Sequence, residues 1–422
     1  MQHMMTALSS ISQGALLTSL SVESMNKYAK LVGQTITPTY KSFLGASAAM
    51  GGMLGSATTV FYQKRLGTIV STRILSMCVV FFLVLTIIPV HLVFLVFCRA
   101  LTSTTIASQF MLMPKFINDN TIMKYKTLVQ TVFSINLNVG IVVGYLLNLT
   151  PYWASTNCFI LSSNILTFIS TFFIKLKASE KTNVQIADKD LEAAQPTAEQ
   201  KVEYTVQEII QQVAVKFPIW RLVIVTITLS AAQLTTGINS ILAYASQILA
   251  SSFPNNSSLG AIVIGVVKII ATISAMPIIN RLRRKILLAI GLYGCVVSNF
   301  ILIFAFKYDI SWLQITVVIM FIIFYQIGPG PIVLMLWGEI FPQNFGPKLT
   351  SLAFTVNWVV NISVTLVFPL YPQVWTAYCV YFIFTGFFGT VALILLPETF
   401  QRTAEEIEKQ YIPKINHRTD KA

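Results

Sequence analysis

The chain has 422 residues, of which 55% are hydrophobic and only 11% are charged. Soluble domains carry roughly 25% charged residues, so this chain has too few charges to cover a water-exposed surface of its own size. Its net charge of +13 does not indicate a nucleic-acid partner, because the basic residues lie in short loops between apolar blocks, where membrane proteins set their orientation. The composition therefore predicts a chain whose surroundings are the lipid bilayer.

Apolar blocks of about 20 residues, the length that crosses a bilayer, follow one another along almost the whole chain. The first six cover 4–22, 40–62, 68–90, 92–113, 127–147 and 154–176. Six more cover 219–249, 259–280, 286–306, 312–336, 350–371 and 375–396. About twelve spans divided in this way predict an all-α membrane protein built from two pseudo-symmetric six-helix bundles.

A polar stretch separates the two sets of spans. It divides the chain into an N-terminal bundle with a short first helix (1–176), a linker (177–217), a C-terminal bundle (218–396) and a tail (397–422). Apolar residues recur at helical spacing from Val202 to Val213, which predicts one amphipathic helix in the linker.

The loops on the two sides of the predicted membrane domain differ in charge. Those on the linker's side carry Lys64, Arg65, Lys115, Lys124, Lys126, Arg281, Arg283, Arg284, Lys285 and Lys348. Those on the opposite side carry Lys27, Lys30, Lys41 and Lys307. The positive-inside rule then places the linker and both termini in the cytosol.

The sequence lacks the patterns of enzymatic or metal chemistry. Its five cysteines lie inside apolar blocks, no C-x-x-C motif occurs, and the three histidines are scattered. It also has no phosphate-binding loop. We therefore expect neither an enzyme nor a bound metal or cofactor.

Polar side chains inside the apolar blocks indicate a binding site. Gln233, Asn239, Asn357 and Asn361 are amides that cost free energy in hydrocarbon unless they are paired. Amides both donate and accept hydrogen bonds, which suits sugar hydroxyls, and Trp358 offers a flat apolar face with an N–H donor. The alternative is that these groups only hydrogen-bond between helices.

The tenth span contains Gly328-Pro329-Gly330-Pro331, which removes backbone donors and loosens the helix. Such broken helices occur in membranes where the freed carbonyls face protein or a wet cavity. The alternative is a kinked packing helix, since Gly and Pro are frequent in transmembrane helices.

Four motifs stand in register in the later half of the chain: Gln233 with Gly237-Ile238-Asn239, then Gly328-Pro329-Gly330-Pro331, Asn357-Trp358 and Pro397-Glu398-Thr399. Together they resemble the sugar porter family of the major facilitator superfamily, which includes the facilitative glucose transporters. The resemblance covers 218–410 well and 92–144 loosely. It implies alternating-access transport of a small molecule such as a sugar, usually at the plasma membrane.

The resemblance also implies roles for individual residues. Arginines in the cytosolic loops would pair with Asp119 and Glu339 at the ends of spans four and ten, and Tyr244 would stand at the outer gate. The gating candidates are Tyr244, Gly328, Pro329, Gly330, Pro331, Arg65, Arg99, Asp119, Arg281, Arg284, Glu339 and Glu398. The substrate candidates are Gln233, Asn239, Trp358, Asn357, Asn361, Lys268 and Asn138.

The chain departs from the family pattern at several positions. Leu234 replaces a second Gln, Leu334 replaces a Trp, Gln326 replaces an acid and Gly346 replaces an Arg. These losses favour one alternative, a non-transporting sensor or partner-binding paralogue.

Lys268 lies near the middle of span eight, where sugar carriers place an Asn. A lysine at a helix centre costs roughly 2.5–3.5 kcal/mol on insertion scales, so it faces water or a partner rather than lipid. No Asp or Glu lies inside any predicted span. Lys268 therefore favours a second alternative, an organic-anion carrier on the same fold.

The first acid of the chain is Glu23, after the first predicted helix. Proton-coupled sugar porters carry a carboxylate inside that helix, so the resemblance implies facilitated diffusion here. We predict a uniporter of a hexose or a similar small polyol.

Overall fold

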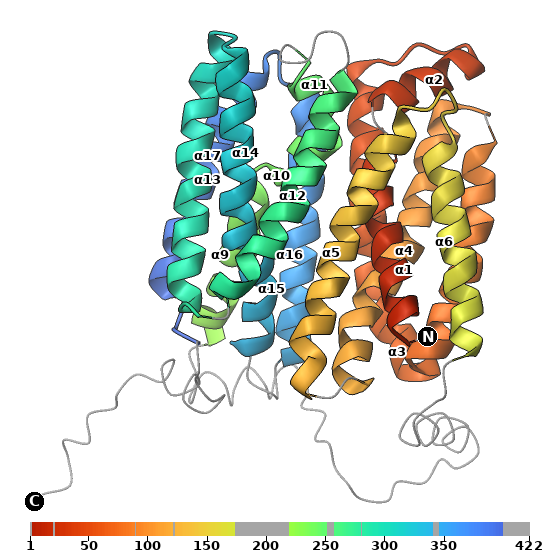
Figure 1. Ribbon diagram of the computed structural model, residues 1–422, viewed down its shortest axis with the longest axis horizontal. Helices are drawn as coiled ribbons and strands as arrows, with labels where there is room; N and C mark the ends of the chain where they lie inside the picture. Colours follow the sequence, from red (N-terminus) through yellow and green to blue (C-terminus); the bar gives the residue numbers. More distant parts are fainter. Residues whose placement is uncertain are drawn as a thin grey trace, which may run out of the picture.

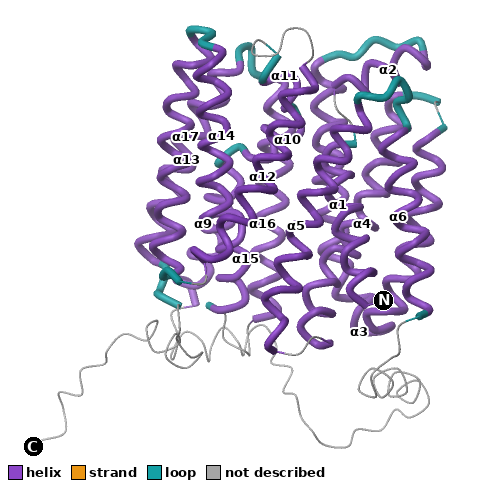
Figure 2. The backbone as a smooth tube through the Cα atoms, in the orientation of Figure 1, coloured by secondary structure: helices purple, strands orange, loops and turns teal. Residues whose placement is uncertain are grey.

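The computed structural model describes the chain as a set of helices joined by short loops (Figure 2). The described residues are 2–19, 22–88, 90–120, 123–173, 219–250, 257–279, 281–340 and 346–399. The predicted linker helix and nearly all of the tail lie outside these ranges.

The N-terminal group holds six membrane passes in five of its six helices (Figure 1, red to yellow). Its helices are α1 (Gln2–Thr18), α2 (Val22–Val32), α3 (Pro38–Ile87), α4 (Leu92–Asn120), α5 (Met123–Asn148) and α6 (Ser155–Phe172). The long α3 supplies two passes, because Gly67, at φ 72°, breaks it. Helix α1 packs on α4, α5 and α6, and α3 packs on α4 and α6.

The C-terminal group also holds six passes (Figure 1, green to blue). Its helices are α9 (Ile219–Thr235), α10 (Ile238–Ala243), α11 (Ala245–Ile248), α12 (Ser257–Ile279), α13 (Arg284–Lys307), α14 (Ser311–Ile327), α15 (Pro329–Glu339), α16 (Gly346–Val367) and α17 (Val374–Leu395). A short 3-10 turn, η1 (Phe368–Leu370), follows α16.

The two groups meet along two helix pairs, α3 with α16 and α5 with α12. We call the end that carries α2 and α11 the upper end, and the end that carries Gly67 and the start of α13 the lower end (Figure 1). The start of α9 and the end of α17 both lie at the lower end. Arg221 on α9 donates a hydrogen bond there to the carbonyl of Leu395 on α17 (3.3 Å).

Within the described residues, eight helical segments are long and apolar enough to cross a membrane. The predicted all-α membrane fold is thus confirmed, whereas several boundaries differ. Span ten is broken at Gly328, in agreement with the Gly-Pro motif, whereas the break of span seven at Gly237 was not predicted.

Helix α2 was not predicted. It lies at the upper end and buries Met25, Tyr28 and Ala29, which follow the i, i+3, i+4 spacing of one helix face. Lys27 donates to the carbonyls of Asn148 (3.1 Å) and Thr150 (2.6 Å). The helix was not predicted because polar residues separate its three buried apolar residues in the sequence, so no apolar block marks it.

Candidate functional site

Two helix breaks of the C-terminal group are joined by one amide. Gln233, near the end of α9, donates from Nε2 to the carbonyls of Pro329 (3.0 Å) and Gly330 (3.4 Å). These residues begin α15, directly after the break at Gly328 (φ −115°, ψ −92°). Gln233 therefore ties the first turn of α15, directly after the break, to α9.

The same amide links a third helix. Asn357 on α16 donates from Nδ2 to Gln233 Oε1 (2.9 Å). Gln233 is 6% exposed, so these bonds form away from bulk water, where an unmade hydrogen bond is costly. Gln233 and Asn357 thus fix the positions of α9, α15 and α16 relative to one another.

Asn239 lies two residues after the other break, at the start of α10. Gly237, at φ 87°, makes this break, and Tyr381 lies where a Cβ on Gly237 would stand. The Asn239 side chain is half-buried and has no hydrogen-bond partner among the described residues. An amide at membrane depth without a protein partner is available to a ligand.

Trp358 carries a second free donor. Its indole N–H is buried and makes no hydrogen bond, and its six-membered ring lies against Gly52 on α3, in the space that a Cβ would occupy. Trp358 therefore crosses from one helix group to the other. By contrast, Asn361 is 7% exposed, and its Oδ1 accepts from Thr365 on its own helix (3.1 Å).

A second polar group joins α5, α12 and α14. Thr272 Oγ1 accepts from Asn138 Nδ2 (2.8 Å) and from Gln326 Nε2, and it donates to the Lys268 carbonyl (2.7 Å). Lys268 itself is 7% exposed. Within the described part of the chain, its ammonium group has no hydrogen bond or ion pair.

Side-chain contacts close the upper end between the two groups. Tyr244 is fully buried, and its hydroxyl donates to the carbonyls of Lys41 and Thr365 (3.4 Å each). Tyr145 on α5 donates to the Leu242 carbonyl (2.5 Å).

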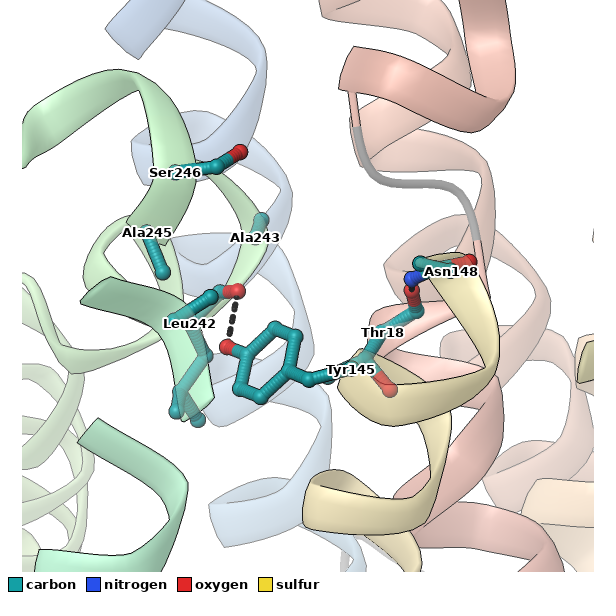
Figure 3. A pocket seen from close by; sticks show the side chains of 8 residues that line it. Thr18, Tyr145, Asn148, Leu242, Ala243, Ala245 and Ser246 are labelled. Carbon is teal, nitrogen blue, oxygen red and sulfur yellow. Dashed lines mark hydrogen bonds between the residues drawn. The ribbon is translucent and has the colours of Figure 1, made fainter. Parts of the chain in front are cut away.

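Figure 3 shows this Tyr145–Leu242 bond across a pocket lined by Thr18, Tyr145, Asn148, Leu242, Ala243, Ala245, Ser246 and Ala261. The pocket lies at the upper end, and half of its lining residues are polar: Thr18, Tyr145, Asn148 and Ser246.

The predicted cytosolic charges lie at the lower end. Arg65 and Arg281 are exposed, and Arg284 donates to the Ile279 carbonyl (2.6 Å). Glu398 accepts a hydrogen bond from the Thr399 backbone (3.1 Å). The side chains of Asp119 and Glu339 lie outside the description, so their pairing with these arginines stays a prediction.

Arg99 stands apart from this group. It is 5% exposed in the upper half of α4, where it donates to Ser19 Oγ and to the Leu16 carbonyl (3.1 Å). Arg99 therefore secures the end of α1 near the upper surface rather than joining the lower charges.

Sequence reasoning missed two polar residues, Thr272 and Tyr145. Thr272 lies four residues after Lys268, one helical turn away, so this spacing was a signal that could have indicated it. Tyr145 sits in an ordinary apolar block, and only the packing of α5 against α10 gives its hydroxyl a partner.

The fold and site together define a class: a multi-pass membrane protein of two six-helix groups with a polar cluster where they meet, which is the architecture of major facilitator transporters. The family model described as "Sugar (and other) transporter" matches residues 5–411. The chain belongs to this family, whose members are integral membrane transporters and not enzymes.

Individual relatives agree with this assignment. The chain is 30% identical to the human "Solute carrier family 2, facilitated glucose transporter member 3" over 245 residues, which are 56% of this chain and 48% of that protein. It therefore spans about half the length of this relative. It is 22% identical to the "Glucose transporter GlcP" of Staphylococcus epidermidis over 418 residues, 91% of this chain and 92% of that one.

Among solved structures, the inward-open xylose transporter XylE from E. coli superposes with a TM-score of 0.78 at 18% identity, covering 97% of this chain and 99% of that one. This likeness shows the fold.

Proposed function

We propose that the protein is a facilitative transporter that carries a hexose or a similar small polyol across a membrane by alternating access. The observation that carries this proposal is the amide cluster at the two helix breaks. Gln233 and Asn357 hold the broken helices in place, while the Asn239 amide and the Trp358 N–H remain without partners among the described residues. Free donors and acceptors beside an aromatic face match a polyhydroxylated ring.

Uniport follows from the distribution of acids. Helix α1 contains no Asp or Glu, and the segment from Ser24 to Asn118 contains none either. A proton-coupled carrier needs a group in the membrane that takes up and releases a proton during the cycle. In the absence of such a carboxylate, the substrate moves down its own gradient.

The upper contacts support a conformation that is closed on one side. Tyr244, Tyr145 and Trp358 each bridge the two helix groups, at the upper end or in the middle. We place the upper end outside the cell, because the lower loops carry Arg65, Arg281 and the other basic residues. Residues 1–176 and 218–396 would rock about the linker, with both termini in the cytosol and the plasma membrane as the location.

Transport by purified protein in sealed liposomes tests the proposal. We expect saturable uptake of labelled D-glucose, or of a polyol derived from it, that stops at equal inside and outside concentrations. An imposed proton gradient should leave this end point unchanged. The Asn239→Ala, Trp358→Ala double variant should lose the uptake.

Two results would contradict different parts of the proposal. Folded protein that takes up no hexose, hexitol or hexuronate would exclude the polyol function. Accumulation driven by the proton gradient would exclude uniport and leave the substrate class intact.

A further inference from the structure

Lys268 occupies a position where an uncompensated charge is costly. It lies at the midpoint of α12, 11 residues from both Ser257 and Ile279, which is roughly 16 Å from either helix end at 1.5 Å per residue. From there, the ammonium group cannot reach the water at either membrane surface. A lysine so placed needs a counter-charge or a water-filled site.

The face of α12 that carries Lys268 meets the other helix group. One turn above Lys268, Gly265 packs against Val142 and Tyr145 on α5. One turn below, Thr272 accepts the hydrogen bond of Asn138, which also lies on α5. Lys268 therefore lies where the two groups separate and close during transport, and not against lipid.

The interiors of the helices in the two groups contain no acid that could neutralise this lysine. Between residues 219 and 396 the sequence contains two acids, Asp309 and Glu339, and these lie in the loop after α13 and at the end of α15. In the N-terminal group, Glu23 and Asp119 also stand at helix ends. Among the described residues no carboxylate lies beside Lys268, so an anion bound from outside the chain can supply its counter-charge.

Neighbouring residues connect the backbone of Lys268 to the amide cluster, beginning with the hydrogen bond from Thr272 to the Lys268 carbonyl (2.7 Å). Thr272 accepts from Gln326, and Gln326 Oε1 lies 3.0 Å from the place that a Cβ on Gly330 would occupy. The Gly330 carbonyl accepts in turn from Gln233 (3.4 Å). The helix turn that carries Lys268 is thus connected, through Thr272 and Gln326, to the helix break that Gln233 anchors.

From this arrangement we infer that the transported polyol is a sugar acid, whose carboxylate binds at Lys268 while its hydroxyls bind at Asn239 and at the Trp358 N–H. The inference rests on the proposed function and names its substrate class. The single ammonium group of Lys268 matches a single negative charge. Arg99 is also buried inside a helix, but it is bonded to α1 at the upper end and adds no second positive charge to this site. The site therefore fits a monoanionic carboxylate better than a doubly charged phosphate.

The test compares two sugars that differ only at C6. D-Glucuronate carries a carboxylate where D-glucose carries a hydroxymethyl group, so their ratio isolates the role of the charge. Binding is measured first, as the thermal stabilisation of the purified full chain in detergent. Uptake into liposomes is measured second.

We expect the native chain to bind D-glucuronate about tenfold or more tightly than D-glucose, as one charge-assisted hydrogen bond predicts. Lys268→Asn should reverse this preference, and Lys268→Arg should retain it. Lys307→Asn, which removes an exposed lysine at the end of α13, should leave the ratio as it is in the native chain.

Uptake adds a readout that a purely structural lysine would not change. Net transport of a monoanion moves charge, so an inside-positive potential should drive D-glucuronate to accumulate and leave the D-glucose end point unchanged. Acetate tests the sugar requirement and should not compete.

Equal binding of the two sugars, or an unchanged ratio in Lys268→Asn, would overturn the inference. Competition by acetate as strong as by D-glucuronate would overturn it as well. D-Glucose uptake without a preference for D-glucuronate refutes only the sugar acid, whereas binding of D-glucuronate without any uptake refutes only the transport function.

Discussion

The two halves of the molecule use buried amides differently. In the N-terminal group, amides connect intact helices: Gln109 donates to Ser76 (2.9 Å), Asn164 donates to Ser12 (3.2 Å), and Asn148 donates to the Thr18 carbonyl (2.7 Å). In the C-terminal group, Gln233 instead donates to carbonyls in the first turn of α15, directly after a helix break, and Asn239 has no partner within the described residues.

This contrast indicates that the two halves have different roles in binding the substrate. Near the breaks at Gly237 and Gly328, polar side chains of the C-terminal group gather, and interrupted helices of this kind form binding sites in transporters. The N-terminal helices, with their amides already paired, supply a packed surface against which that site opens and closes. Recognition should therefore depend on the C-terminal half, and mutations in matched residues can test this.

The largest difference is expected between two buried glutamines. Gln233→Leu removes the donor to Pro329 and Gly330 and the acceptor for Asn357. At about 1 kcal/mol or more for each bond, kcat/KM for uptake should fall by roughly 100-fold. Liposome uptake at varied substrate concentration measures this.

Gln109→Leu is the matched control, since Gln109 is equally buried and bonds Ser76 (2.9 Å) within the N-terminal group. It should lower the thermal midpoint and leave KM near the native value. If both variants changed KM alike, recognition would not be confined to one half.

The next effect concerns the contact across the groups at Trp358. Its ring fills the space where Gly52 would carry a Cβ, so Gly52→Leu must force the ring and α3 apart. Overpacking of this kind costs about 1–3 kcal/mol and acts on the closed state. The maximal uptake rate should fall about tenfold while thermal stability changes less.

Gly386→Leu controls for the larger side chain, because no atom lies within 4 Å of a Cβ at Gly386. Uptake by this variant should match the native chain. A Gly52→Leu protein with a native rate would show that Trp358 does not approach α3 during transport.

How much of this site was predictable varies with the kind of interaction. Gln233, Asn357 and the Gly328–Pro331 break could be found because a polar or helix-breaking residue inside an apolar block stands out by composition alone. Their partners could not, since the bond from Gln233 to the Pro329 carbonyl joins residues 96 positions apart and depends on how α9 packs against α15.

The fold could be predicted from the length of the apolar blocks. The features that were missed are those that block length does not report. Block length marks apolar residues but not backbone direction, so the break at Gly237 was hidden inside a single predicted span. Helix α2 was missed because it has only 11 residues and Glu23, Lys27 and Lys30 interrupt its apolar positions. Arg99 was a gating candidate by motif alone, and only the structure places it near the start of α4, where it bonds the end of α1 at the upper end.

A smaller effect is expected at Asn239, where no protein bond is lost. Asn239→Ala should leave the thermal midpoint unchanged, because the amide has no hydrogen-bond partner among the described residues. The KM for uptake should rise by roughly tenfold, as the loss of one or two hydrogen bonds to substrate predicts.

Asn164→Ala should give the opposite pattern. Asn164 is fully buried and donates to Ser12 and to the Ile160 carbonyl, so its loss should lower the thermal midpoint with little change in KM. A destabilised Asn239→Ala protein with native KM would mean that this amide packs the helix and does not bind substrate.

The smallest effect is expected at the upper contact, where one hydroxyl links the two halves. Tyr145→Phe removes the bond to the Leu242 carbonyl (2.5 Å). At about 1 kcal/mol, the population open at the upper end should rise roughly fivefold. The labelling rate of a Ser246→Cys reporter in the adjacent pocket, read by mass spectrometry of that peptide, measures this change.

Tyr378→Phe isolates the role of that bond, because the Tyr378 hydroxyl is buried without a hydrogen-bond partner. Removing it breaks no contact between the halves, so the reporter should label at the native rate. Equal acceleration in both variants would mean that loss of a buried hydroxyl loosens the fold in general, and that the Tyr145–Leu242 bond does not act as a gate. Acceleration in Tyr145→Phe alone would show that a bond between an N-terminal side chain and a C-terminal backbone carbonyl holds the upper end closed.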